Sequence, residues 1–301
     1  VTVGEGVGFV GLCEGAPEGA GGAGALLGAA GAWWSQRGRD TIRGPVNPSM
    51  NAECGLLIEG FDMMPMVMMP YNPRAYVDFV ETAGFGKCKD LYAYLIHHKD
   101  MLPGSEKHER LVRIVSVLRR RHPEVHLHCL DMKKYQQEIL RFLAVFEEAR
   151  GQNWGYVPLT EEEILETAAE MKMVVDPEVI IFAEVDDEPA GALIAIPNIS
   201  GPLKSINGRL FPFGFLKFLR EIKGLDTMRV LGIAALEKHR AKGITALLLM
   251  EVILRSIEAG YHTAEASWVL EDNDMSNRTI SKALNPTRYK TYRIYEKSVG
   301  V

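Results

Sequence analysis

Apolar and polar positions along the second half of the chain follow the two periods expected of strands and helices. Strand-like apolar runs occur in six segments: 125–132, 179–185, 190–196, 227–236, 263–270 and 289–296. Helix-like spacing occurs in four segments: 134–149, 160–172, 244–258 and 274–283. Thr160 and Glu163 have the spacing of a capping box, and Asp187-Glu188 predicts a hairpin turn. The order β-α-α-β-β-β-α-β-α-β predicts a mixed α/β sheet.

The first half has fewer regular elements. Strands are expected over 7–12, 41–46 and 87–96, and helices over 16–37 and 75–82. A long stretch rich in Pro and Met runs to Pro73. The segment 97–123 carries charges of both signs, including Arg119-Arg120-Arg121, and we interpret it as a helical linker whose basic run is a solvated helix end.

The ends of the two halves resemble each other. The Tyr-bearing strands 87–94 and 288–295 align at a constant offset of 201 residues, and the helices before them align as well. This predicts a tandem repeat of one fold. Because Val1 opens directly in strand-like sequence, we expect the first copy to be cut short at its N-terminus. The expected domains are a first copy over 1–96, a linker over 97–123 and a second, complete copy over 124–301.

Composition narrows the class of protein. A chain of 301 residues suits two domains, and its net charge of −5 gives no electrostatic reason to expect nucleic acid or a membrane as partner. No apolar run approaches the roughly 20 residues that span a bilayer. The four cysteines are scattered without a CxxC pair, which favours a reducing cytoplasm. His126 and His128 lack an evident third ligand, so no metal site is expected.

The junction between strand 227–236 and helix 244–258 has the clearest chemistry. A helix N-terminus presents unpaired N–H groups and the positive end of its dipole. Arg240 and Lys242 add positive charge there, and Gly243 lets the backbone approach an anion closely. The junction is therefore a candidate cradle for a pyrophosphate. The alternative is an ordinary helix start with solvated basic residues.

The segment Arg240-Ala241-Lys242-Gly243-Ile244-Thr245 resembles the R/Q-x-x-G-x-G/A signature of the GNAT superfamily, which grips the pyrophosphate of acetyl-CoA. Thr245 departs from the usual Gly or Ala. Longer motifs are similar to those of a group of bacterial tandem GNAT-like proteins: 43–49, 55–61, 68–73, 153–159, 267–273 and 289–297. The resemblance covers almost the whole chain. It implies an acyl-CoA N-acyltransferase fold, a mixed and mostly antiparallel sheet flanked by helices.

The resemblance also assigns cofactor contacts. It implies that Ile233, Ala234 and Ala235 offer backbone groups to the pantetheine arm and the thioester, where an N–H would stabilise the oxyanion. Asn277 lies where many members have a CoA-contacting Asn. Seven residues later many members carry a Tyr that protonates the leaving thiolate, but this chain has Leu284.

Four residues are candidates for proton transfer. Glu271, followed by Asp272, ends a strand where the acceptor is expected, and either could act as general base through a water. A carboxylate at this place could equally cap the helix that follows. Tyr289 and Tyr292 could replace the missing acid, although tyrosines in strands more often serve packing.

The first copy differs in chemistry. Its equivalent junction carries Glu14 and Glu18 without a basic residue, so we expect a degenerate, non-catalytic copy. Its insertion holds five methionines that could line an acyl or substrate groove, with ordinary core packing as the alternative: Met63, Met64, Met66, Met68 and Met69. The expected reaction is transfer from acetyl-CoA or another acyl-CoA to the amine of a small molecule or peptide. The rival hypothesis is a non-catalytic acyl-CoA-binding module, and a homo-oligomer is possible under either.

Overall fold

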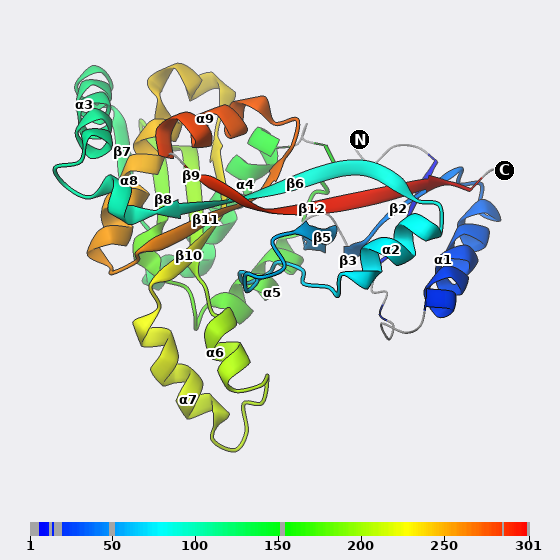
Figure 1. The fold of residues 1–301 in the computed structure, drawn as a ribbon. Coiled ribbons are helices and arrows are strands. Elements are labelled where there is room, and N and C mark those ends of the chain that lie inside the picture. Colours follow the sequence, from blue (N-terminus) through cyan, green and yellow to red (C-terminus); the bar gives the residue numbers. More distant parts are fainter. Residues whose placement is uncertain are drawn as a thin grey trace.

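The structure, a computed structural model, describes residues 6–11, 14, 20–47, 52–150, 154–284 and 286–299. One large sheet runs through the molecule with helices on both faces (Figure 1). The described part of the first half contains these α-helices and strands: β1 (Val7–Phe9), α1 (Ala20–Ser35), β2 (Thr41–Gly44), β3 (Val46–Asn47), β4 (Glu53–Cys54), β5 (Leu56–Glu59), α2 (Ala75–Thr82) and β6 (Gly86–His97). The expected linker contains helix α3 (Glu106–Arg121).

The second half supplies twelve elements: β7 (Val125–Cys129), α4 (Tyr135–Arg150), α5 (Glu161–Met171), β8 (Ile180–Val185), β9 (Glu188–Pro197), α6 (Ser200–Ser205), α7 (Gly214–Glu221), β10 (Thr227–Ala235), α8 (Ile244–Glu258), β11 (Thr263–Leu270), α9 (Asp274–Leu284) and β12 (Thr287–Ser298). The predicted capping box is confirmed, since Thr160 accepts from the Glu163 N–H and Glu163 accepts from the Thr160 N–H. The expected element order is wrong in one place, because α6 and α7 are inserted between β9 and β10.

The sheet is mixed and mostly antiparallel, as expected. Its strand order is β1-β2-β12-β6-β11-β10-β9-β8-β7, with β5 also paired to β12. Among the described residues, only β1 with β2 and β10 with β11 are parallel pairs. Each pair is joined by a helix, α1 in the first half and α8 in the second. In the second half a shorter helix and a long strand, α9 and β12, follow directly, and in the first half α2 and β6 follow after the short strands β3, β4 and β5.

The long strands β6 and β12 tie the two halves together. β6 lies between β11 and β12, although it belongs to the first half of the sequence. The end of β12 in turn pairs with β2, in the first half. Leu91 pairs directly with Tyr292, and these residues are equivalent at the offset of 201. The two halves are therefore related by a local twofold arrangement through this residue pair, and the sheet crosses the domain boundary expected at residue 96.

Packing on the two faces of the sheet follows the alternation of the strands. On one face, Met228 and Ala264 join a core with Ile244 and Leu248 of α8. The opposite face packs against α4 and α5 at one end. Further along the same face it packs against the Met-rich segment of the first half, through Met66 and Met69. No helix among the described residues is both long enough and apolar enough to cross a membrane.

Candidate functional site

The two central parallel strands diverge halfway along their length. β10 and β11 pair from Thr227 with Thr263 to Val230 with Ala266, where the described pairing ends. β10 then has an irregular register against β9 between Val230 and Gly232, and it continues to pair with β9 as far as Ala235. One edge of the segment 233–235 therefore borders a gap between strands. Its backbone N–H and C=O groups on that edge have no described strand partner, and a role for Ile233, Ala234 and Ala235 in binding an extended ligand stays a prediction.

The loop after β10 leads to a helix N-terminus at the mouth of this gap. A short turn of 3₁₀ helix (Glu237–Lys242) ends at Gly243, whose φ of 70° is in the left-handed region. The left-handed conformation favours glycine here, and a Cβ at this position would lie 2.8 Å from the end of the Leu118 side chain on α3, which would have to shift. No side chain of the described residues caps α8, which leaves its first N–H groups and its dipole to a ligand such as a phosphate.

Two basic side chains of the loop, Arg240 and Lys242, already have acidic partners. Arg240 pairs with Glu237 at 2.6 Å, both largely exposed, and Lys242 pairs with Glu124 at the end of the linker. The Lys242 ammonium lowers the pKa of Glu124 to about 2. The ring nitrogen Nδ1 of His239 is buried and has no hydrogen-bond partner among the described residues. A bound pyrophosphate would therefore compete with two carboxylates for the loop's positive charge.

Replacing Arg240 with Glu should weaken CoA binding by about 10- to 100-fold, since a charge-assisted contact becomes a repulsion. The matched variant Glu237→Gln should strengthen binding, because it removes the carboxylate that competes for Arg240. Calorimetric titration with CoA measures both. Equal affinity of the two variants and the unmodified protein would show that this loop does not contact the cofactor.

A buried polar cluster lies where the strands separate, on the face opposite α8. It consists of four side chains, which we call the Glu265 cluster: Arg229, Glu265, Ser267 and Tyr289. The Ser267 hydroxyl and the Tyr289 hydroxyl both donate to the Glu265 carboxylate, which is fully buried. The Arg229 Nε donates to Ser267 Oγ at 2.8 Å, and its Nε lies 3.9 Å from Glu265. Burial and the neighbouring Glu265 raise the pKa of Tyr289, so its hydroxyl stays protonated at neutral pH.

Arg229 also ties this cluster to the first half of the chain. Its Nη1 donates to the carbonyl oxygens of Val67 and Met68 at 2.7 and 3.0 Å. The neighbouring Lys290 is buried and donates to the Met64 carbonyl at 2.7 Å. The Met-rich segment is thus held over the cluster by buried cations. The hydroxyl of Tyr292 is buried and has no hydrogen-bond partner among the described residues.

Glu271 and Asp272, the carboxylates proposed from the sequence as general bases, lie outside the Glu265 cluster, directly after the end of β11. Glu271 pairs with Lys87 at 2.6 Å and accepts from the Asp90 N–H at 3.1 Å. Asp272 pairs with Lys89 at 2.6 Å. Asn273 supplies the cap that was considered for Glu271, because its Oδ1 accepts from the Ser276 N–H. Glu271 and Asp272 border the same end of the gap as the loop, and their role as base stays a prediction.

Asn277 joins α9 to two strands. Its amide donates to the carbonyl oxygens of Leu270 and Glu271, and its Oδ1 accepts from the Tyr94 hydroxyl at 2.8 Å. All of these bonds are internal to the protein, so a contact between Asn277 and CoA stays a prediction. They also bring a tyrosine hydroxyl of the first half next to the helix in which many GNAT members carry their acid.

Arg229, Glu265 and Ser267 are not among the site residues predicted from the sequence. Arg229 and Glu265 each interrupt an apolar strand, and they are directly opposite each other in the register of β10 and β11. A charged residue in the middle of a buried strand is rare unless it is paired, and that is the signal that could have found them. No group of metal-ligating side chains suited to an ion occurs within the described ranges.

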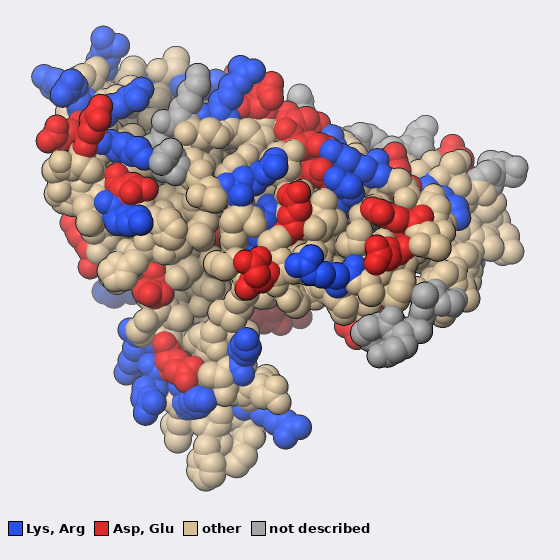
Figure 2. Space-filling model, viewed as in Figure 1, with Lys and Arg blue, Asp and Glu red and all other residues tan. Residues whose placement is uncertain are grey.

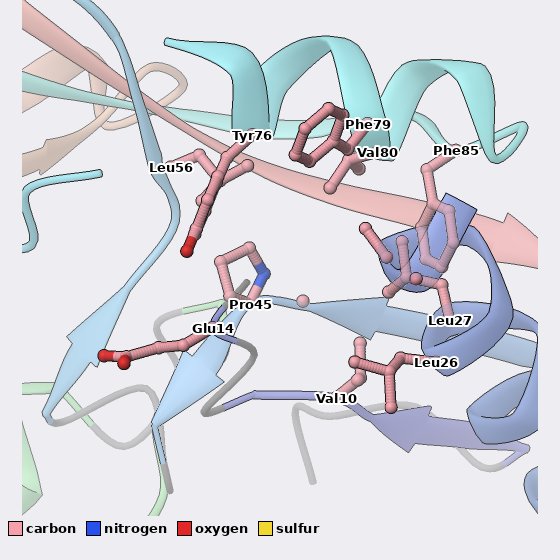
Figure 3. Close-up of a pocket in the computed structure, with 13 residues that line it drawn as sticks. Val10, Glu14, Leu26, Leu27, Pro45, Leu56, Tyr76, Phe79, Val80 and Phe85 are labelled. Carbon is pink, nitrogen blue, oxygen red and sulfur yellow. The ribbon is translucent and has the colours of Figure 1, made fainter. Parts of the chain in front are cut away.

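The first half holds an apolar cavity of about 240 Å³ between α1 and α2 (Figure 3). Leu26 and Leu27 of α1, Tyr76 and Phe79 of α2 and the end of β2 line it, and Glu14 is the charged side chain among its described lining residues. The cavity lies beside α1 of the first half. The gap between β10 and β11 has the corresponding position beside α8 of the second half. The remainder of the junction, including Glu18, falls outside the described residues. The cavity suits a hydrocarbon chain better than a nucleotide.

A single CoA should bind per chain, because the described part of the first-half cavity offers no cation for a pyrophosphate. Calorimetry that counts binding sites tests this. The Arg240→Glu variant is the control, since it should weaken the only site rather than halve the stoichiometry. Two sites per chain would contradict the expected asymmetry.

Comparison with known proteins identifies relatives along the whole chain, although no family model matches it. The bacterial ceramide synthase of Caulobacter vibrioides is 35% identical over 280 residues, which cover 91% of this chain and 71% of that protein. Protein YghO of Escherichia coli is 33% identical over 285 residues, covering 91% and 70%.

Solved structures show the same fold at low identity. A GCN5-related N-acetyltransferase from Sphaerobacter thermophilus matches with a TM-score of 0.55 and 15% identity, covering 94% of this chain and 70% of that chain. A fungal GCN5-related glucosamine N-acetyltransferase region matches with a TM-score of 0.53 and 14% identity, covering 96% and 29%. The expected GNAT-type fold is confirmed.

Proposed function

Because the chain belongs to the family of the bacterial ceramide synthase and YghO, we propose that it is an acyltransferase that moves an acyl group from acyl-CoA to an amine. The observation that supports this most is the gap between β10 and β11, which opens at the uncapped N-terminus of α8. An extended thioester ligand fits such a gap, with its pyrophosphate at the helix dipole.

In this proposal the backbone of the site binds the acyl-CoA donor, and the buried side chains of the site face the amine acceptor. Acyl-CoA would supply an activated carbonyl carbon. The exposed edge of 233–235 would hold the pantetheine arm, and a backbone N–H there would bind the carbonyl oxygen as negative charge develops. The acceptor would approach from the face that carries the Glu265 cluster, opposite α8. The new C–N bond forms as the C–S bond breaks, and the thiolate takes a proton.

The amine must lose a proton during this step. Tyr289 donates to Glu265 and could take the amine proton as it passes its own to the carboxylate, a relay of two groups already hydrogen-bonded. Glu271 is the alternative base, but Lys87 and a backbone N–H already occupy its oxygens. We therefore propose Tyr289 and Glu265 as the proton route.

We also propose that the acceptor amine carries a long hydrocarbon chain. The name of one relative, a ceramide synthase, indicates a product that contains such a chain. The Met-rich segment supports this, since it exposes three methionines beside the Glu265 cluster: Met63, Met64 and Met68. Methionine side chains adapt to flexible apolar chains. A peptide amine would find little polar surface there.

A thiol-release assay tests the proposal with two donors, acetyl-CoA and hexadecanoyl-CoA, and two acceptors, a long-chain 2-amino-1,3-diol and a lysine peptide. We expect thiol release that depends on the long-chain amine, with the amide product identified by mass. The sequence analysis favours acetyl-CoA and the name of the relative favours a longer donor, and this assay separates them.

A non-catalytic acyl-CoA-binding module is the second candidate. The pairing of Arg240 and Lys242 with carboxylates and the loss of the usual tyrosine at Leu284 favour it. Such a protein would bind CoA in calorimetry but release no thiol with any acceptor. Turnover with one amine is enough to exclude it.

A further inference from the structure

A helical hairpin projects from the body of the protein between β9 and β10. It contains α6 and α7, and Figure 1 shows it extending away from the sheet. At its tip the sequence Leu210-Phe211-Pro212-Phe213-Gly214-Phe215-Leu216 runs for seven residues without a charge. GNAT-like sequence patterns did not predict this insertion, and the acyl-transfer site described above does not use it.

The tip exposes large apolar side chains to solvent. Phe211 is 86% exposed, Phe213 75% and Leu216 66%. Leu203, Leu210 and Phe215 add further exposed apolar surface. Contiguous exposed aromatic surface of this kind is costly in water and marks a docking site.

The tip is a built structure rather than a loose loop. Ile206 and Phe218 are buried in the hairpin, and the Phe215 N–H donates to the Leu210 carbonyl at 2.7 Å. A Cβ on Gly214 would lie 1.9 Å from the Arg209 carbonyl oxygen, so the chain can turn this tightly only with glycine. The hairpin therefore holds its aromatic residues outward by its own packing.

Positive charge surrounds this apolar tip. Between residues 200 and 224 the chain carries five basic residues and one acidic residue, a net of +4, in a protein whose net charge is −5. All five are exposed: Lys204, Arg209, Lys217, Arg220 and Lys223. Figure 2 shows Lys and Arg gathered on the protruding hairpin around an uncharged end. Net charge alone gave no reason to expect a membrane partner, but the charge is unevenly distributed.

We infer that this hairpin docks the protein on the surface of an anionic lipid bilayer, with Phe211, Phe213 and Leu216 inserted among the lipids. Aromatic and aliphatic tips flanked by Lys and Arg match the two layers of such a surface, apolar below and negative above. The base of the hairpin also contacts the Met-rich segment, since the Asn198 side chain accepts from the Val67 N–H. In a docked protein, the Met-rich segment that covers the Glu265 cluster would therefore be held directly to the base of the membrane-bound hairpin.

Binding to vesicles tests this without any acyl-CoA, so the result is independent of the proposed activity. The full chain should sediment with vesicles of phosphatidylcholine and phosphatidylglycerol and much less with phosphatidylcholine alone. Phe211→Ser/Phe213→Ser/Leu216→Ser should weaken binding at least tenfold, because it removes the inserted apolar area. Arg209→Glu/Lys223→Glu should lower affinity for the anionic vesicles by on the order of fivefold or more per residue.

Controls separate docking from misfolding. Met173→Ser/Met275→Ser changes apolar side chains that are 58% and 60% exposed outside the hairpin, and it should bind like the unmodified protein. Phe213→Trp should show a blue-shifted emission that vesicles with brominated lipid quench. Absence of binding by the unmodified chain, or unchanged binding by the triple variant with native melting, would overturn the inference. So would a dimer that the triple variant dissociates, because the hairpin would then cover a second copy.

Discussion

Replacement of Glu265 by Gln is expected to lower turnover by about 10²- to 10⁴-fold, the usual cost of losing a general base. The glutamine keeps the shape of the side chain, and its single oxygen can still accept from one of the two hydroxyls, Ser267 or Tyr289, while its NH2 group donates to the other. It cannot take a proton, so the relay through Tyr289 ends there. CoA affinity should change little, since the loop at Arg240 lies at the other side of the gap. Steady-state thiol release and calorimetry on one preparation measure both quantities.

The matched control is Glu271→Gln, which removes the other carboxylate at the open end of the strands. Glu271 pairs with Lys87 at 2.6 Å and accepts from the Asp90 N–H at 3.1 Å, so both of its oxygens already have partners. Its variant should keep turnover within a few-fold of the unmodified protein, while Tyr289→Phe should resemble Glu265→Gln. A large loss with Glu271→Gln and none with Glu265→Gln would assign the base to Glu271.

Replacement of Arg229 by Met is expected to destabilise the fold by about 3–5 kcal/mol, as found when one partner of a buried ion pair is removed. Arg229 is buried and donates to Val67, Met68 and Ser267, and it is the closest cation to the buried Glu265 carboxylate. Its loss leaves that carboxylate uncompensated and two carbonyl oxygens of the Met-rich segment without a donor. Urea denaturation of the variant measures the change.

The double variant Arg229→Met/Glu265→Gln is the control for this assignment. It removes the carboxylate that the single variant leaves unpaired, so it should recover a substantial part of the lost stability. The hydrogen bonds to Val67 and Met68 stay missing, and recovery should be incomplete. A single variant as stable as the unmodified protein would mean that the cluster contributes nothing to the fold.

The local pattern of apolar and polar residues was sufficient to predict most helices and strands of the second half. Helix α8 and strand β11 have the predicted bounds, because their apolar spacing is regular and uninterrupted. The hairpin α6–α7 was missed for a physical reason. Its two helices have only 6 and 8 residues, so even the amphipathic spacing of α7 covers about two turns, which is too short to identify a helix by pattern.

The site was only partly predictable for a different reason. The loop 240–245 is contiguous in sequence, and its position at a helix N-terminus could be inferred from local signals. The Glu265 cluster draws on β10, β11 and β12, and its contacts with Val67 join residues that are 162 positions apart. Such contacts depend on sheet register and on the exchange of long strands, which no local pattern encodes.

The exchange of β6 and β12 between the halves has a consequence during synthesis. β6 is complete at residue 97, but β11, its partner on one side, begins only at residue 263. At roughly 5–20 residues per second, the ribosome needs on the order of ten to thirty seconds to make the intervening chain. During that time the 12-residue strand β6 has both backbone edges unpaired, which is the state most prone to aggregate. The nascent first half is therefore a natural client for chaperones until the last strand leaves the ribosome.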